Sequence, residues 1–207
     1  MKYIPAHVTN FSVGRKQTID HIVIHYTGND GDTAEGNGKY FSGAGRAASA
    51  HYFVDENEVV QSVREGDVAW HAGNWQMNAR SIGVEMCSRK DAGGLYFIPE
   101  ATVRNAQALV RELMAKYGIG VDAVIRHYDV TGKKCPEPYV RQPALWEKFK
   151  EGLRVSTGSK PSAWAKSACD KAVKKGIIQG DDKGDCKWQE PVSTERLMVI
   201  LDRLGLL

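Results

Sequence analysis

The sequence contains no long hydrophobic run. No segment approaches the roughly 20 consecutive apolar residues that a membrane-spanning helix requires. The first residues, Met1–His7, also lack the apolar core and small-residue cleavage site of a secretory signal. We therefore expect a protein that does not bind membranes. We also expect it to be synthesised in the cytoplasm without a signal peptide.

An excess of charge of one sign is also missing. The 28 Lys and Arg residues nearly balance the 25 Asp and Glu residues, which leaves a formal net charge of +3. The densest basic pairs, Lys133-Lys134 and Lys174-Lys175, are too short to form a polybasic tract. The composition and the lack of a nucleic-acid-binding motif predict no nucleic-acid partner.

Cysteine is scarce as well, with 4 in 207 residues, so the chain is not a disulfide-dense scaffold. Cys169 and Cys186 are close enough in the sequence to pair if they are oxidised. The small, polar and proline residues of 155–162 predict a linker. This linker divides the chain into a domain at 1–154, long enough for one core, and a small module at 163–207.

Strand and helix patterns alternate in the first domain. Ile82, Val84 and Met86 alternate with Gly83, Glu85 and Cys87, so one strand places the two sets on opposite faces. Hydrophobic residues at helical spacing predict a helix that begins near Val103 and ends before Gly118. The fold class expected is α/β. The predicted strands are 22–25, 50–54, 59–63, 82–87 and 124–127, with a hairpin turn at 55–58.

Three side chains are candidate metal ligands. His25 and His127 lie at the ends of predicted strands, and Cys135 lies in the loop that follows His127. Two imidazoles and one thiolate are good zinc ligands, and they leave one tetrahedral position open, as catalytic zinc requires. Taken singly, each histidine is better explained as a core or surface residue than as a ligand.

Several motifs occur together in the first domain. They are Ile22-Val23-Ile24-His25-Tyr26-Thr27, Ser49-Ala50-His51-Tyr52-Phe53-Val54, Ala69-Trp70-His71-Ala72-Gly73, Asn78-Ala79-Arg80-Ser81-Ile82-Gly83-Val84-Glu85, Arg126-His127 and Gly132-Lys133-Lys134-Cys135-Pro136. In this order they resemble the amidase-2 family of N-acetylmuramoyl-L-alanine amidases, over roughly residues 18 to 150. The resemblance implies a mixed central β-sheet flanked by helices, as in peptidoglycan recognition proteins. It also implies hydrolysis of the bond between N-acetylmuramic acid and L-alanine in peptidoglycan.

The resemblance also assigns roles to residues. It places one Zn2+ on His25, His127 and Cys135, the acidic catalytic residue on Glu85 and a catalytic lysine on Lys133. Glu85 would move protons between water and the leaving nitrogen, and Lys133 would oppose negative charge on the intermediate. A salt-bridged strand carboxylate is the structural alternative for Glu85, and a solvated loop lysine is the alternative for Lys133.

A second set of residues is predicted to contact the glycan strand or the stem peptide of peptidoglycan. Trp70 offers an apolar surface to the sugar or the peptide. For His51, a structural role is the alternative to substrate binding. Some members of the family have a tyrosine where this sequence has Ala50, so more of the proton transfer falls on Glu85. The predicted substrate-binding residues are Tyr26, His51, Trp70, His71 and Asn78.

The C-terminal module has two predicted helices separated by a polar loop. The features Trp164-Ala165-Lys166, Lys175–Gly180 and Pro191–Leu197 resemble a single S-layer-homology repeat. This resemblance implies binding to secondary wall polymers, while formation of a homo-oligomer or simple stabilisation are the alternatives.

These observations lead to one main hypothesis, a phage or prophage endolysin that acts on the cell wall after release from the cytoplasm. A host autolysin is the alternative within the same enzyme class. A non-catalytic peptidoglycan-binding protein and a structural zinc site are alternatives from other classes. The presence of Cys135 argues against the first of these. A fourth ligand from His51 or Cys87 would support the second.

Overall fold

The computed structural model describes residues 1–154, 161, 165–180, 186, 188 and 194–206. The chain divides into two compact units, Met1–Leu153 and Arg154–Leu207. Each unit is considered by itself below. The predicted linker at 155–162 lies outside the described residues except for Pro161. The expected domain limits therefore stay a prediction.

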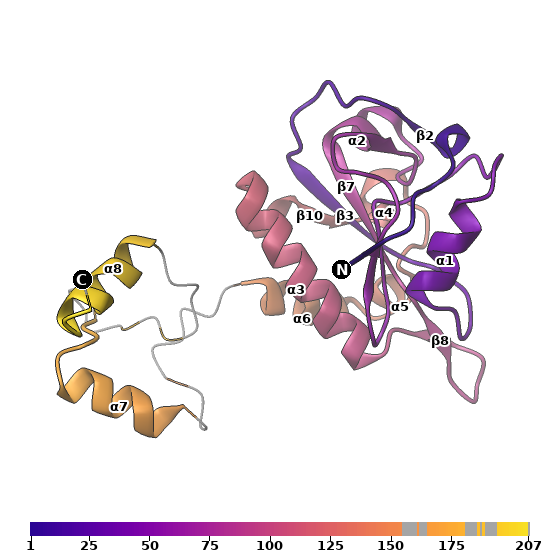
Figure 1. Ribbon diagram of the computed structural model, residues 1–207. Helices are drawn as coiled ribbons and strands as arrows, with labels where there is room; N and C mark the ends of the chain where they lie inside the picture. Colours follow the sequence, from indigo (N-terminus) through magenta and orange to yellow (C-terminus); the bar gives the residue numbers. More distant parts are fainter. Residues whose placement is uncertain (155–160, 162–164, 181–185, 187, 189–193, 207) are drawn as a thin grey trace. The chain divides into compact units, whose positions relative to one another are not determined.

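The first unit is built on a six-stranded sheet (Figure 1). Its strands, in spatial order, are β1 (Lys2–Tyr3), β5 (Val59–Gln61), β4 (Tyr52–Val54), β7 (Ser81–Met86), β3 (His21–Tyr26) and β10 (Val124–Arg126). β4 and β5 pair antiparallel, as the predicted hairpin requires, and the remaining pairs are parallel. The prediction of an α/β fold with a mixed central sheet is confirmed.

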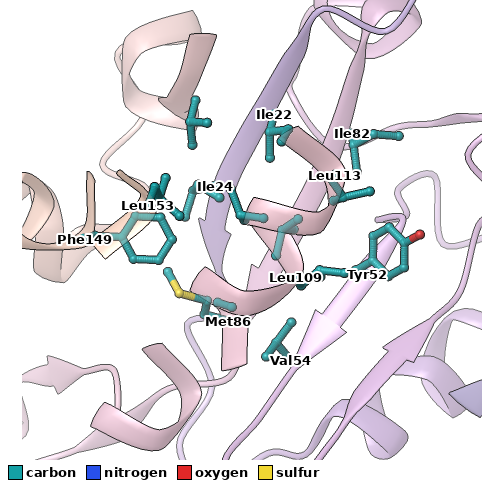
Figure 2. Close-up of a cluster of buried hydrophobic side chains, with 14 of the residues drawn as sticks. Ile22, Ile24, Tyr52, Val54, Ile82, Met86, Leu109, Leu113, Phe149 and Leu153 are labelled. Atoms are coloured by element: carbon teal, nitrogen blue, oxygen red, sulfur yellow. The ribbon is translucent and has the colours of Figure 1, made fainter. Parts of the chain in front are cut away.

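One face of the sheet carries the main hydrophobic core (Figure 2). β-branched and other apolar side chains at alternate positions of β3 and β7, such as Ile22, Ile24 and Ile82, are fully buried there. They pack under α3 (Glu100–Tyr117) and α6 (Pro143–Leu153), which contribute Leu109 and Phe149. The alternation predicted for β7 is confirmed on this face, because Ile82, Val84 and Met86 all belong to the core.

The predicted helix is α3, and its end is confirmed. Gly118 follows the helix with φ +65°, and its N–H donates to the Met114 carbonyl. This left-handed conformation is strained for residues that carry a Cβ, so glycine is the favoured residue at this position.

The opposite face of the sheet is covered in part by α1 (Ala34–Phe41). Ala34, Phe53 and Val60 form a second, smaller core there. α2 (Trp75–Arg80) leads directly into β7 and places Asn78 at its centre. The shorter elements are β2 (Phe11–Ser12), β6 (Val68–Ala69), β8 (Arg89–Lys90), β9 (Tyr96–Phe97), α4 (His127–Thr131), α5 (Glu137–Arg141) and two 3-10 turns at Val8–Asn10 and Val121–Ala123.

Several bounds of the predicted strands are wrong. β4 begins at Tyr52, β5 ends at Gln61 and β7 spans Ser81–Met86. β3 continues one residue beyond His25, and β10 ends at Arg126, so His127 opens a helix where a strand end followed by a loop was expected. The Asp129 carboxylate accepts hydrogen bonds from the backbone N–H and the side chain of Arg126, and this capping starts α4 at His127.

The second unit contains α7 (Lys166–Lys174) and α8 (Thr194–Arg203), as the two predicted helices require. Trp164 and residues 191–193, which carry part of the repeat resemblance, lie outside the described residues. All four cysteines are free thiols. Among the described helices, none combines the length and the apolar character needed to cross a bilayer.

Candidate metal centre

Three parallel strands bring the candidate residues to one edge of the sheet. β3 lies between β7 and β10, and all three run in the same direction. His25 on β3 pairs in register with Glu85 on β7, and His127 directly follows β10. Because the carboxyl ends of parallel strands meet at one edge, residues far apart in sequence converge there.

Cys135 reaches this edge through a tight return of the chain after α4. Gly132, with φ +77°, ends the helix, and its N–H donates to the Tyr128 carbonyl. The Tyr128 N–H then donates to the Cys135 carbonyl over 2.8 Å, which ties the cysteine to the start of the same helix. The Cys135–Pro136 peptide bond is cis.

The ligand atoms of His25, His127 and Cys135 lie within 4.8 Å of one another. Cys135 Sγ is 3.7 Å from Nδ1 of His25, so this nitrogen faces the cluster. The three residues are 1%, 5% and 4% exposed, respectively. The cluster contains no fourth histidine, cysteine or carboxylate among the described residues, so neither His51 nor Cys87 supplies the ligand that a structural zinc site would need.

The protonation states of these groups suit a metal. Burial, followed by the charges of His127 and Lys133, holds the pKa of His25 well below 6.5. Burial and the charge of Lys133 also lower the pKa of His127, so both imidazoles are neutral near pH 7. Burial raises the pKa of the Cys135 thiol to about 12, and a coordinated cation would displace that proton. Two neutral imidazoles and an ionisable thiol therefore fit a zinc ion.

Glu85 lies at the side of this cluster. Its Oε1 is 3.9 Å from His25 Nδ1, and its Oε2 is buried without a hydrogen-bond partner. Burial raises the pKa of Glu85 to about 8, the charge of Lys133 lowers it, and the charge of Asp32 raises it. An unpaired carboxylate in this position can exchange protons with a molecule bound beside the cluster.

Lys133 is exposed, and its charge acts on the whole site. Burial is the main cause of the shifted pKa values of His25, His127, Glu85 and Cys135, and the Lys133 charge lowers all four of them. Lys134, the next residue, contributes to none of these four shifts. The ammonium group is therefore in a position to oppose negative charge that develops at the cluster.

A pocket of about 460 Å³ extends from Glu85 toward α1. Its lining is mixed, with aromatic groups such as Tyr40 and Phe53 and polar groups such as Asn29 and Asn37. An apolar wall with a few polar groups is typical of ligand-binding pockets. Glu85 is the residue that joins this pocket to the metal-ligand cluster.

The predicted substrate-binding residues fall into two groups. Tyr26 and Trp70 are partly exposed, and the Trp70 indole N–H donates to Ser12 Oγ over 3.0 Å. His51, His71 and Asn78 are only 0%, 9% and 6% exposed. Substrate contact by any of these five residues stays a prediction.

Sequence reasoning missed Arg15. Its guanidinium donates to five backbone carbonyls, those of Glu65, Asp67, Asn78, Ala79 and Ser81. These carbonyls belong to two segments of the chain, 65–67 and 78–81, which Arg15 ties together. A lone arginine in a polar N-terminal stretch carries no pattern that distinguishes it from a surface residue.

This geometry first defines a class, an α/β protein in which parallel strands present a buried cluster of two histidines and one cysteine that could hold a metal ion. The family model of N-acetylmuramoyl-L-alanine amidase (Amidase_2) matches residues 15–138, which include all three ligands and Glu85. The chain therefore belongs to the amidase-2 family.

Individual relatives support the same assignment. A probable N-acetylmuramoyl-L-alanine amidase of Bacillus licheniformis is 37% identical over 172 residues, which are 76% of this chain and 48% of the relative. The amidase BlyA of Bacillus subtilis is 33% identical over 177 residues, which are 76% of this chain and 47% of BlyA. The chain thus spans about half the length of these curated relatives.

Solved structures are similar to a large part of this chain. The catalytic domain of XlyA superposes with a TM-score of 0.64 and 29% identity, covering 73% of this chain and 97% of that domain. PlyL superposes with a TM-score of 0.64 and 26% identity, covering 74% of this chain and 96% of PlyL.

Proposed function

We propose that this protein is a zinc-dependent amidase that cleaves the bond between N-acetylmuramic acid and L-alanine in bacterial peptidoglycan. The observation that carries the proposal is the cluster of His25, His127 and Cys135 within 4.8 Å, with the unpaired carboxylate of Glu85 beside it. The names of the relatives supply the substrate, because they are N-acetylmuramoyl-L-alanine amidases.

One zinc ion would be held by His25, His127 and Cys135, which leaves a coordination position for a non-protein ligand. When bound, zinc supplies a Lewis acid that polarises a carbonyl group and makes a water molecule more acidic. The thiolate of Cys135 neutralises part of the ionic charge, and the two neutral imidazoles bind without losing a proton.

The protein's own groups move protons and stabilise charge. Glu85 accepts a proton from the attacking water and then passes it to the alanine nitrogen, so that the leaving group departs as a neutral amine. The Lys133 ammonium opposes the negative charge that develops on the former carbonyl oxygen. The pocket between Glu85 and α1 holds part of the stem peptide or the sugar beside these groups. The partly exposed side chains of Tyr26 and Trp70 contact another part of the substrate.

The biological setting proposed is that of a phage or prophage endolysin. A mutant endolysin from Bacillus subtilis superposes on this chain with a TM-score of 0.63 and 29% identity, covering 97% of that chain. A host autolysin is the alternative, because both kinds of enzyme use the same reaction.

For the C-terminal unit we propose attachment to secondary wall polymers, with a homo-oligomer as the alternative. The support is the sequence resemblance to an S-layer-homology repeat and the presence of the two helices α7 and α8. A single repeat binds weakly, so several copies on one wall surface would raise the effective affinity.

The experiment that tests the proposal combines metal content with product chemistry. Zinc per chain is measured first, and purified peptidoglycan is then digested and assayed for newly freed N-terminal alanine and for reducing sugar. We expect one zinc per chain and new alanine amines without new reducing ends, both abolished by a chelator and restored by zinc. Zinc binding without new amines from several wall types would refute the amidase and favour a binding protein.

A further inference from the structure

The two imidazole ligands share one neighbouring segment. This neighbour is the segment His71–Gly73, between β6 and α2. We propose that His71 and Ala72, held in place by Asn78, are positioning groups that fix the ring orientation and the tautomer of His25 and His127 for metal binding. This inference rests on the metal site of the proposed function.

A continuous chain of hydrogen bonds fixes the tautomer of His25. Its Nδ1 faces Cys135 and must be unprotonated to bind a metal, so the proton of the neutral ring is on Nε2. Nε2 lies 3.0 Å from Nδ1 of His71, which therefore accepts the hydrogen bond. The proton of His71 is then on Nε2, which lies 3.3 Å from the Ser81 hydroxyl.

The chain ends at a group that accepts hydrogen bonds and never donates them. The Ser81 hydroxyl donates to the Met77 carbonyl over 2.5 Å. A carbonyl at the end sets the direction of every earlier bond, because Ser81 must then accept from His71 and His71 must accept from His25. The only assignment that satisfies all three bonds leaves His25 Nδ1 free for the metal.

The second imidazole is held by the next residue of the same segment. The Ala72 backbone lies close enough to the His127 ring to raise its pKa, against the lowering by burial and by the charge of Lys133. Its Nε2 is on the Gly73 side, because a Cβ added to Gly73 would come within 3.5 Å of this atom. Metal-binding histidines commonly donate their second ring N–H to a carbonyl or another acceptor, and this bond orients the ring.

Asn78 holds the backbone of the segment. Its side-chain Oδ1 accepts hydrogen bonds from the N–H groups of His71 and Ala72, at 3.1 and 2.7 Å. One buried oxygen on α2 therefore fixes the two residues that contact the two ligands. The backbone carbonyl of Asn78 is held in turn by Arg15 at 3.2 Å.

Gly83 provides the space for the His71 ring. A Cβ at this position of β7 would lie 2.5 Å from Cγ of His71, which is closer than side chains approach one another. The ring therefore packs directly on the strand backbone, two residues before Glu85. This close packing restricts His71 to the orientation that faces His25.

The same geometry explains why His71 is a positioning residue and does not contact substrate. The residue is 9% exposed, and its two ring nitrogens are engaged by His25 and Ser81. Neither nitrogen is left to bind a sugar or a peptide. The motif Ala69–Gly73 suggested a histidine that contacts substrate. In the structure its histidine instead orients His25, on the side of the ring opposite Cys135.

The test measures zinc affinity in the full-length protein by competition with a chromophoric chelator. The visible spectrum of the Co2+-substituted protein reports the ligand geometry at the same time. His71→Leu removes the acceptor, while His71→Asn places an amide oxygen near the position of Nδ1. We expect His71→Leu to weaken zinc binding by about 10- to 100-fold and to change the Co2+ spectrum. His71→Asn should recover most of the affinity.

Two further variants keep the test decisive. Leu109→Ala creates a cavity in the core on the other face of the sheet, so it lowers stability without touching the segment His71–Gly73. Its zinc affinity should equal that of the wild type. Ser81→Ala removes one hydroxyl and should weaken zinc binding less than His71→Leu does. It serves as the readout if His71→Leu does not fold.

The outcomes separate this inference from the proposed function. If the wild type binds zinc and releases alanine amines while His71→Leu, or Ser81→Ala in its place, binds zinc equally tightly, the inference is wrong and the proposed amidase stands. Equal losses of zinc affinity in Leu109→Ala and His71→Leu would also overturn it. A wild type that binds no zinc would overturn both.

Discussion

Glu85 is the direct neighbour of His25 across two parallel strands, and its Oε1 lies 3.9 Å from Nδ1 of His25. This relationship places a carboxylate beside the metal ligands although 60 residues separate the two in sequence. Its Oε2 is buried without a hydrogen-bond partner, which costs free energy in the folded protein and is a feature of groups that act in binding or catalysis.

The first prediction concerns this carboxylate. Glu85→Gln keeps the size of the side chain but removes its ability to accept a proton, so amide hydrolysis should fall by about 10²- to 10⁴-fold. Zinc per chain should not change, because Glu85 is not one of the three ligands. The rate of alanine-amine release and the zinc content, measured on the same sample, check this outcome.

The control is Cys87→Ala, because Cys87 follows Glu85 by two residues and lies on the same face of the strand. The Cys87 thiol is buried two residues after Glu85 and is not among the metal-ligand cluster. Cys87→Ala should keep zinc and nearly full activity. Turnover of Glu85→Gln close to that of Cys87→Ala would show that Glu85 does not transfer protons.

The second prediction compares two adjacent lysines. The charge of Lys133 lowers the pKa values of Glu85 and Cys135, whereas Lys134 contributes to neither. Lys133→Met should lower kcat by about 10²-fold, the usual effect of removing one group that stabilises transition-state charge. Lys134→Met, its matched control, should stay near wild type in kcat and KM. Equal effects of the two substitutions would assign Lys133 to the solvated surface.

The third prediction concerns the stability that the hydrogen bonds of Arg15 give to the first unit. Arg15→Met keeps the apolar stem but removes the donors to five backbone carbonyls. Asn78, Ala79 and Ser81 are buried, and their carbonyls left without a partner should lower the free energy of unfolding by at least about 3 kcal/mol. Urea unfolding checks this value. Arg46→Met, at an exposed arginine, should change stability by less than about 1 kcal/mol. A small effect at both positions would show that water replaces the Arg15 donors.

The fourth prediction is a pH dependence of stability through Glu65. Burial raises the pKa of Glu65, but hydrogen bonds from Lys116, Tyr117 and Tyr52 outweigh it, so the pKa lies below 4.5 in the folded protein. Between the unfolded and the folded pKa, the unfolded state binds more protons, so stability falls as pH falls. The stabilisation is complete above about pH 5 and is lost through the folded pKa.

Comparison with Glu65→Gln isolates this contribution from that of the other carboxylates. The wild type should exceed the variant most in free energy of unfolding above pH 5, and the difference should narrow toward pH 3. Urea unfolding of both proteins at a series of pH values measures it. A difference that does not change with pH would mean that the Glu65 pKa is the same in both states.

Much of the first unit could be predicted from residue patterns. The alternation in β7 identified which side chains enter the core and which share the face of Glu85, because side chains on a strand point to opposite sides. The helix α3 followed from hydrophobic spacing, and its end followed from Gly118. The start of α4 at His127 was not predictable, because it depends on a local carboxylate cap.

The roles of the inner residues required the fold. The sequence motifs predicted that His71 and Asn78 contact substrate. They are buried because β6 and α2 fold against β7, and Gly83 leaves space there for the imidazole ring. Arg15 gave no signal at all, since its carbonyl partners come from segments 50 or more residues away.

The sequence by itself determined which residues are candidate metal ligands, the family motifs and the hydrophobic alternation of the sheet, because each is visible in residue types and short motifs. The tertiary structure decided which atoms of these ligands meet and what holds them. Three parallel strands bring His25, Glu85 and His127 to one edge. One segment, His71–Gly73, lies beside both imidazoles. Long-range strand pairing and buried hydrogen bonds set those contacts, and neither leaves a short-range pattern in the sequence.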